Sequence, residues 1–99
     1  MKKKIVVFIS GRGTNALNII NKFRDSNNIS VTKVYSNNEN SPLLKGQNNL
    51  KTHISYFSND QLSLQVFKEL KIIDPDLIVL AGFLKKIPTI YIDLSLIHI

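Results

Sequence analysis

The amino-acid sequence predicts an α/β protein with a Rossmann-like, doubly wound and mainly parallel β-sheet. Two observations carry this prediction. Short apolar runs alternate along the chain with segments of helical periodicity, and the run at residues 77–81 is apolar on both faces. A strand of that kind is typical of the centre of a parallel sheet with helices on each side. The 99 residues allow one domain at most, and a three-layer sandwich usually needs more.

The opening of the chain predicts a strand, a glycine turn and a helix. Ile5–Ile9 is continuously apolar, and the sequence Ser-Gly-Arg-Gly directly follows it. Thr14 is a suitable N-cap for a helix that extends to about Asp25. The apolar side chains of this helix recur about one turn apart, as expected for a face that packs on a sheet: Leu17, Ile20 and Phe23.

The middle of the chain predicts two further strands with a short helix between them. Ile29–Ser36 has the apolar content of a strand and is ended by a polar run at residues 37–40. Pro42 suits the first turn of a short helix, because a residue in that position needs no N–H donor, and Gly46 would end the helix. Thr52–Phe57 follows as a third strand or extended edge segment.

A longer helix and a central strand come next. Asp60 is a suitable N-cap for this helix, and Asp74-Pro75-Asp76 breaks it. Its apolar side chains lie on one face: Leu62, Val66, Leu70 and Ile73. The run Leu77–Ala81 is then the central strand. Strands that alternate with helices imply right-handed βαβ units in a single sheet.

Composition and charge argue against several classes of protein. No apolar run is long enough to span a bilayer, and Ile5–Ile9 is too short for a signal-peptide core, so we expect a cytoplasmic protein without a membrane partner. The absence of cysteine excludes disulfides and thiolate chemistry, and two isolated histidines predict no metal site. The formal net charge is +6, but the basic residues are scattered, and we expect a solvated surface rather than a nucleic-acid partner.

The loop at residues 10–15 is the strongest candidate for a binding site. Ligands bind beyond the carboxyl ends of strands in such sheets, and a glycine turn before a helix presents free backbone N–H groups to an anion. The loop is not a dinucleotide fingerprint, because Ala16 stands at the third glycine position, and no Gly-Lys-Ser/Thr of a P-loop follows. We expect Gly13, Thr14 and Asn15 to bind a phosphate monoester. The alternative is that Thr14 is only a cap and Asn15 an ordinary first-turn residue.

Three segments of the chain resemble the phosphoribosylglycinamide formyltransferase family. They are the Ser-Gly-x-Gly-Thr-Asn loop, Val34–Asn37 at the end of the second strand, and Pro75–Leu84, where Asp-Leu-Ile-Val-Leu-Ala-Gly-Phe is the most specific piece. The match runs in order from about residue 4 to about residue 90. The resemblance implies formyl transfer from 10-formyltetrahydrofolate to the amine of 5-phosphoribosylglycinamide, a step of purine biosynthesis.

The resemblance also implies roles for particular residues. Gly13, Thr14 and Asn15 match the loop that holds the ribose phosphate of the substrate. A second segment matches the lining of the folate pocket: Leu84, Lys85, Lys86 and Ile87. A solvated loop is the alternative for the two lysines. His53 belongs to a Thr-His pair that is frequent in the family, and we expect its role to be structural. The basic residue that often contacts folate in the family has no counterpart near Asn59 and Asp60.

The family's catalytic Asn, His and Asp have no match in this chain. His98 is not that histidine, because Leu96 replaces the expected Asn, no proline follows, and the spacing from Gly82-Phe83 is several residues too short. Residues 94–99 resemble a translated transposon-end adapter of the kind ligated to DNA for sequencing. We therefore expect residues 1–93 to be the N-terminal, substrate phosphate-binding part of a formyltransferase domain, truncated before its catalytic half and inactive alone, and residues 94–99 to be a non-native tail.

Two alternative functions remain open. A related formyltetrahydrofolate hydrolase would transfer the formyl group to water, but such hydrolases carry a bulkier pair in place of Gly82-Phe83 and lack the Ser-Gly-x-Gly-Thr-Asn loop. A non-catalytic phosphosugar- or nucleotide-binding module with a Rossmann-like sheet is the other alternative. Such a module would not respond to folate analogues, whereas a transferase would.

Overall fold

A five-stranded sheet forms the middle layer of the protein. The computed structural model describes residues 3–11, 13–45, 52–58, 65–81 and 96–98. The strands are β1 (Lys3–Ile9), β2 (Ile29–Ser36), β3 (His53–Tyr56), β4 (Leu77–Leu80) and β5 (Leu96–His98). They lie in the order β3-β2-β1-β4-β5, and every neighbouring pair is parallel.

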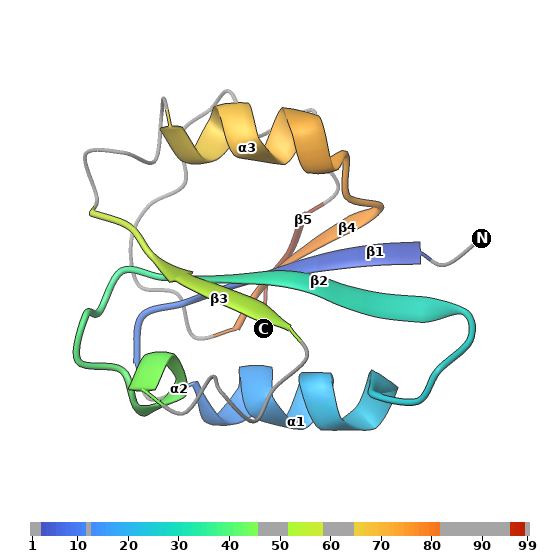
Figure 1. The fold of residues 1–99 in the computed structure, drawn as a ribbon, viewed down its shortest axis with the longest axis horizontal. Coiled ribbons are helices and arrows are strands. Elements are labelled where there is room, and N and C mark those ends of the chain that lie inside the picture. The colour runs from blue at the N-terminus through green and yellow to red at the C-terminus, as the bar shows by residue number, and fades with distance from the viewer. Residues whose placement is uncertain (1–2, 12, 46–51, 59–64, 82–95, 99) are drawn as a thin grey trace.

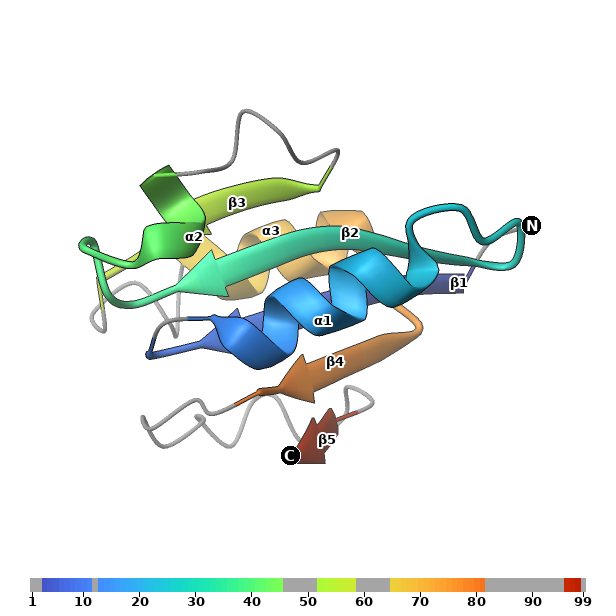
Figure 2. The same ribbon diagram turned by 90° about the horizontal axis from the view of Figure 1, so that it is seen from below.

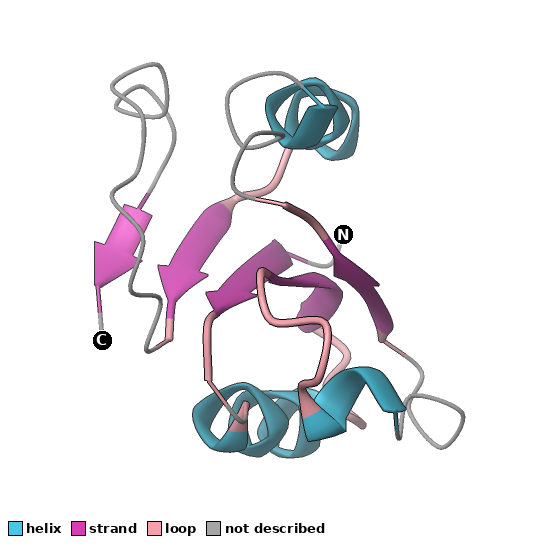
Figure 3. Cartoon of the chain, turned by 90° about the vertical axis from the view of Figure 1, so that its left-hand side faces the viewer, coloured by secondary structure: helices cyan, strands magenta, loops and turns pink. Residues whose placement is uncertain are grey.

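Helices cover both faces of this sheet. The helix α1 (Thr14–Phe23) and the short helix α2 (Pro42–Lys45) lie on one face, and α3 (Gln65–Ile73) lies on the other (Figure 1). Seen from below, the arrowheads of β1, β2 and β4 point the same way, and α1 lies over β1 and runs back along the strands in the opposite direction (Figure 2). The end-on view separates the three layers (Figure 3). The predicted α/β, doubly wound architecture is confirmed.

The observed bounds lie close to the predicted ones. The strand Ile29–Ser36 has the bounds expected from the sequence, and β1 begins two residues earlier than predicted. The third strand is shorter than the predicted Thr52–Phe57. Asp60 and Leu62, the expected start of the third helix, lie outside the described residues, as does Gly46.

The strand β1 is buried on both faces, which explains its continuous apolar sequence. Ile5, Val7 and Ile9 pack with residues of α1, whereas Val6 and Phe8 pack with residues of α3. The strand β4 divides in the same way: Val79 and Ala81 belong to the α1 side, and Ile78 and Leu80 to the α3 side. Burial of these side chains is the main stabilising contribution that the sequence can supply.

An irregularity in β2 changes which of its side chains face α1. Ile5 lies opposite Val31, but Val6 lies opposite Lys33, so Thr32 is an extra residue in β2. Val31 and Val34 consequently pack in the same cluster although they are three residues apart. Beside the bulge, the buried Thr52 hydroxyl donates a hydrogen bond to the carbonyl of Val31 at 2.9 Å. This hydrogen bond joins Thr52, the residue directly before β3, to β2 beside the bulge.

The buried face of α1 differs from the predicted stripe. Ala16 and Ile20 are the buried residues, and Ile19 and Phe23 pack against the same cluster. Leu17, which we expected on this face, is 37% exposed, so that prediction is wrong. The small side chain of Ala16 faces the sheet instead. In α3 the predicted face is confirmed for the described residues: Val66 and Leu70 are buried, and Ile73 packs against them.

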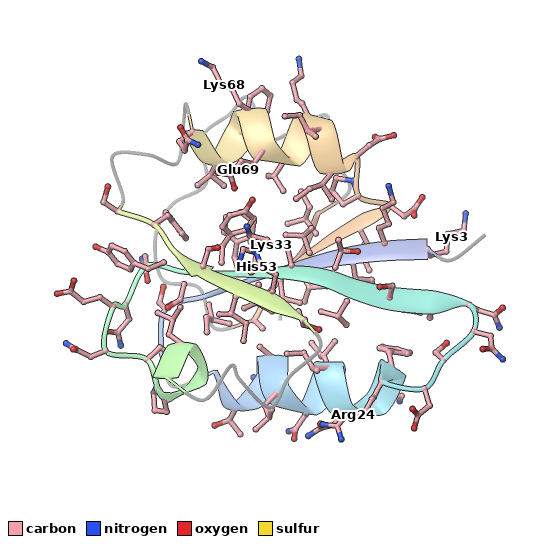
Figure 4. The ribbon with its side chains drawn as sticks, viewed as in Figure 1. Lys3, Arg24, Lys33, His53, Lys68 and Glu69 are labelled. Carbon is pink, nitrogen blue, oxygen red and sulfur yellow. The ribbon has the colours of Figure 1, made fainter. Side chains whose placement is uncertain are left out.

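A hydrogen-bonded carboxylate connects α3 to the sheet. The Tyr35 hydroxyl donates to Glu69 Oε1 at 2.7 Å, and Gln65 Nε2 donates to Glu69 Oε2 at 3.0 Å. Lys33 Nζ lies 3.8 Å from the same carboxylate, and Figure 4 shows Lys33 and His53 on the sheet below Glu69. The Tyr35 hydrogen bond, then that of Gln65, and the nearby Lys33 and His53 lower the pKa of Glu69 below its ordinary value of 4.5, although burial opposes them.

We expect Leu70→Ala to destabilise the protein by about 2–5 kcal/mol, because it leaves a cavity beneath α3. Leu70 is completely buried. Ile72→Ala, on the same helix, is the matched control, since Ile72 is 84% exposed and its truncation should change the unfolding free energy by less than about 0.5 kcal/mol. Urea unfolding of both variants measures the difference. Equal effects would contradict the packing of α3 on the sheet.

We expect Tyr35→Phe to raise the pKa of Glu69, because the variant keeps the ring and removes the donor that stabilises the carboxylate. A lowered pKa in the folded protein stabilises it above the pKa of an unfolded Glu. That contribution disappears as the pH falls through the lower pKa of the folded state. Wild type should therefore exceed Tyr35→Phe in stability at pH 7 by more than at pH 3.

A pH titration of the Glu69 carboxyl by NMR and urea unfolding at both pH values check this expectation. Tyr56→Phe is the control, because Tyr56 is 46% exposed and Glu69 accepts the hydrogen bond of Tyr35. A Glu69 pKa that is unchanged in Tyr35→Phe would show that the hydrogen bond does not set it.

Candidate functional site

The candidate site lies at the carboxyl edge of the sheet, where the strand order reverses. From β1 the chain proceeds outward to β2 and β3, and it then crosses to the other side of β1 to form β4. The helix α1 follows β1 on one face, and α3 precedes β4 on the other. The helix after β1 and the helix before β4 thus lie on opposite faces, and the carboxyl end of such a pair of strands is the usual position of a ligand in an open α/β sheet.

Gly13 makes the turn from β1 into α1. Its backbone is left-handed, with φ 84° and ψ 18°, and its carbonyl accepts the first helical hydrogen bond from the Leu17 N–H at 2.8 Å. This conformation favours glycine, because a Cβ would be strained there. Gly13 is thus the N-cap, and Thr14 is the first helical residue. The prediction that Thr14 caps the helix is wrong.

The start of α1 can hold an anion. The N–H groups of Thr14, Asn15 and Ala16 precede the first intrahelical hydrogen bond, so the helix offers them no acceptor. The first turn contains no acidic residue, and the side chains of Thr14 and Asn15 are exposed. The positive end of the helix dipole adds to this preference for negative charge. A phosphate that reaches these groups would also find the Thr14 hydroxyl and the Asn15 amide.

The loop before Gly13 leaves room beside the helix start. Gly11 is exposed, and a Cβ at this position would meet no other atom within 4 Å. Packing therefore does not require glycine at residue 11, whereas the backbone conformation does require it at residue 13. Of the two glycines in the predicted loop, only Gly13 sets the direction of α1.

A polar turn stands next to this loop at the end of β2. The Ser36 hydroxyl donates to the Asn38 carbonyl and accepts the Asn38 N–H, both at 3.1 Å, and the Asn37 N–H donates to the Ile9 carbonyl at 3.3 Å. The sequence pattern predicted Ser36 as the end of a strand and Asn37 as the start of the polar run after it, and it did not predict these hydrogen bonds. A serine that precedes asparagines at a strand end is the signal that could have revealed a side-chain-stabilised turn.

The structure brings the predicted phosphate-binding residues together but does not reach the predicted folate-binding ones. Gly13, Thr14 and Asn15 are consecutive at the N-terminus of α1, whereas Leu84, Lys85, Lys86 and Ile87 lie outside the described residues. His53 is exposed on the edge strand β3, where it contributes to the low pKa of Glu69. His98 is in β5, in register with Leu80.

Within the described part of the chain, no cluster of three or more His, Cys, Asp or Glu side chains could hold a metal ion. None of the helices that the structure describes has the length and apolar character needed to cross a membrane. Three of the basic residues labelled in Figure 4, Lys3, Arg24 and Lys68, belong to different elements and point to different sides of the protein.

Comparisons with known proteins agree with this fold. The model of the formyl transferase family matches residues 3–96. The phosphoribosylglycinamide formyltransferase of Anaplasma phagocytophilum has a similar structure, with a TM-score of 0.84 and 23% identity, over 99% of this chain and 49% of that one. The corresponding enzyme of Coxiella burnetii gives a TM-score of 0.80 and 28% identity, over 99% of this chain and 51% of that one.

A formyltetrahydrofolate deformylase of Pseudomonas putida shares the same fold, with a TM-score of 0.82 and 16% identity, over 99% of this chain and 38% of that one. No curated protein matched the sequence. The chain spans about half the length of the formyltransferase structures that it matches. The resemblance to phosphoribosylglycinamide formyltransferases is confirmed at the level of the fold, and the family model covers almost every residue. This chain therefore belongs to the formyl transferase family.

Proposed function

We propose that this chain is the substrate phosphate-binding part of a phosphoribosylglycinamide formyltransferase. The whole enzyme would move a formyl group from 10-formyltetrahydrofolate to the amine of 5-phosphoribosylglycinamide. The observation that carries the proposal is the left-handed Gly13 at the start of α1, which directs free N–H groups beyond the carboxyl end of β1 in a chain of this family.

In this proposal the chain binds and orients the phosphorylated substrate. The phosphate would accept hydrogen bonds from the backbone at residues 14–16 and from the side chains of Thr14 and Asn15. The ribose and its amine would then extend along the edge formed by β1 and β4. We further propose that Leu84, Lys85, Lys86 and Ile87, which follow β4 in the sequence, line the folate pocket, so that donor and acceptor meet at the same edge.

The group transferred is a formyl group: the substrate amine bonds to its carbon and gives up a proton, the bond from that carbon to N10 of the folate breaks, and N10 takes up a proton. The chain offers no match to the family's Asn, His and Asp that assist this exchange, so we propose that residues 1–93 alone do not catalyse it. The proposal assigns residues 94–99 to a non-native tail. Residues 96–98 extend the sheet as β5, and backbone pairing of this kind is open to many apolar sequences.

A formyltetrahydrofolate hydrolase is the second candidate, because a deformylase shares the fold. The Ser-Gly-x-Gly-Thr-Asn loop favours the transferase, since a hydrolase that delivers the formyl group to water needs no site for a ribose phosphate. We also propose a cytoplasmic protein that acts on small molecules rather than on nucleic acid.

We expect ribose 5-phosphate to bind at the start of α1 and to shift the backbone amide signals of Thr14, Asn15 and Ala16 in an NMR titration. Asn15→Ala should weaken binding about tenfold, because a hydrogen bond to a charged group is lost. Asn18→Ala is the matched control, one turn further along the exposed side of the same helix, and it should bind as wild type does. Unphosphorylated ribose should cause no shift. Equal losses in the two variants, or shifts with ribose itself, would contradict a phosphate site here.

We expect the purified chain to produce no formylated product from 10-formyltetrahydrofolate and 5-phosphoribosylglycinamide above the buffer background. The physical reason is the missing general acid–base and oxyanion-stabilising groups. The same sample must show ribose 5-phosphate binding, so that a misfolded protein is not mistaken for an inactive one. Turnover by the pure chain would show that it contains a catalytic group that we have not identified.

Binding of a folate analogue would distinguish the transferase from a module that binds only phosphosugars.

A further inference from the structure

The hydroxyl of Ser36 is completely buried at the carboxyl end of β2, although serine is usually a surface residue. Its oxygen forms two hydrogen bonds with one residue, because it donates to the Asn38 carbonyl and accepts the Asn38 N–H. A buried hydroxyl that is satisfied only by backbone two residues ahead fixes the shape of the turn between them.

This turn is attached to the strands on both sides of β2. The Ser36 carbonyl accepts the Phe57 N–H at 2.9 Å, which connects the turn to the end of β3. The Asn37 N–H donates to the Ile9 carbonyl, which connects it to the last residue of β1. Ile9 immediately precedes the loop that leads through Gly13 into α1. The turn is therefore hydrogen-bonded to the residue from which that loop starts.

We propose that Ser36 is a positioning residue for the anion-binding start of α1. Its hydroxyl holds the 36–38 turn in the shape that places the Asn37 N–H against Ile9, and Ile9 in turn fixes the origin of the loop. The role in ligand binding rests on the proposed function, whereas the role in ordering the loop does not. Ser36 would act through the backbone and without contact to the ligand.

Ser36→Ala tests this role, because it removes the hydroxyl with little change in volume. Without it the Asn38 N–H loses its partner, and the Asn38 carbonyl retains the Ser41 N–H at 3.1 Å. We expect the turn to relax and to hold the Ile9 carbonyl less firmly. Ser36→Cys is the second variant, with a side chain of similar shape and a much weaker hydrogen-bonding group, for use if the alanine variant does not remain folded.

Ser26 offers a matched control at the opposite edge of the sheet. Its hydroxyl also makes two hydrogen bonds to nearby backbone, with the N–H groups of Asn28 and Ile29, both at 3.1 Å. These hold the turn that enters β2 at its amino end, far along the strand from the loop. Ser26→Ala thus removes the same chemistry from a place that does not touch the end of β1.

The experiment measures amide hydrogen exchange in the free chain and ribose 5-phosphate affinity by NMR, with urea unfolding as the stability reference. We expect Ser36→Ala to speed exchange of the Asn37 and Leu17 amides, which donate to the Ile9 and Gly13 carbonyls, and to weaken ribose 5-phosphate binding about fivefold, the equivalent of one neutral hydrogen bond. Ser26→Ala should lose stability without either effect.

The outcomes separate this inference from the proposed function. Unchanged exchange of the Asn37 and Leu17 amides in Ser36→Ala would overturn the positioning role, as would equal changes in both serine variants. If exchange is faster in Ser36→Ala alone and the wild-type chain does not bind ribose 5-phosphate, the positioning of the loop is supported and the phosphate site is refuted. Faster exchange with unchanged affinity would overturn the link between Ser36 and the ligand.

Discussion

The position of β1 between β2 and β4 is the constraint on which the rest of the structure depends. This strand is hydrogen-bonded along both edges and buried on both faces, so it can be neither exposed nor displaced without loss of both apolar clusters. Its two faces require a helix on each side. The reversal of strand order beside it then leaves one edge of the sheet open to a ligand.

Polar contacts fix both ends of that strand. At its amino end, the Asp76 carboxylate accepts the Lys4 N–H at 2.8 Å, the Lys4 carbonyl accepts the Asp76 N–H at 2.9 Å, and Lys4 Nζ donates to the Ile73 carbonyl. These bonds attach the α3–β4 connection, where Asp74 has a positive φ of 52°, to the start of β1. At its carboxyl end, the Asn37 N–H of the turn around Ser36 donates to the Ile9 carbonyl, and the glycine N-cap sets where α1 begins. The apolar middle of β1 stabilises the fold, and the polar contacts fix the position of its two ends.

In the proposed function, substrate binding and catalysis depend on different groups. The described part of the chain contains the sheet that orients α1, and the helix start offers hydrogen-bond donors that need no charged side chain. The backbone donors depend on the conformation at Gly13, whereas the Thr14 hydroxyl and the Asn15 amide are the side-chain contributions to the proposed phosphate site. Formyl transfer itself requires side chains that accept and donate protons. The chain spans about half the length of the formyltransferases of similar structure.

The sequence by itself determined the fold class, most element bounds and the position of the glycine turn, because each depends on local periodicity or on the special backbone of glycine. The run Leu77–Ala81 was predicted to be a central strand, since burial on both faces leaves no polar position, and Ile5–Ile9 was predicted to be a strand. Other features were decided only in the tertiary structure. The extra residue Thr32 in β2, the inward position of Ala16 in place of Leu17, and the capping of α1 by Gly13 depend on how the strands align and how closely the helix approaches the sheet. The turn at Ser36 belongs to the same group, because its hydrogen bonds to Ile9 and Phe57 join residues that are far apart in the sequence. Such contacts have no local signature, and only the assembled sheet brings their partners within reach.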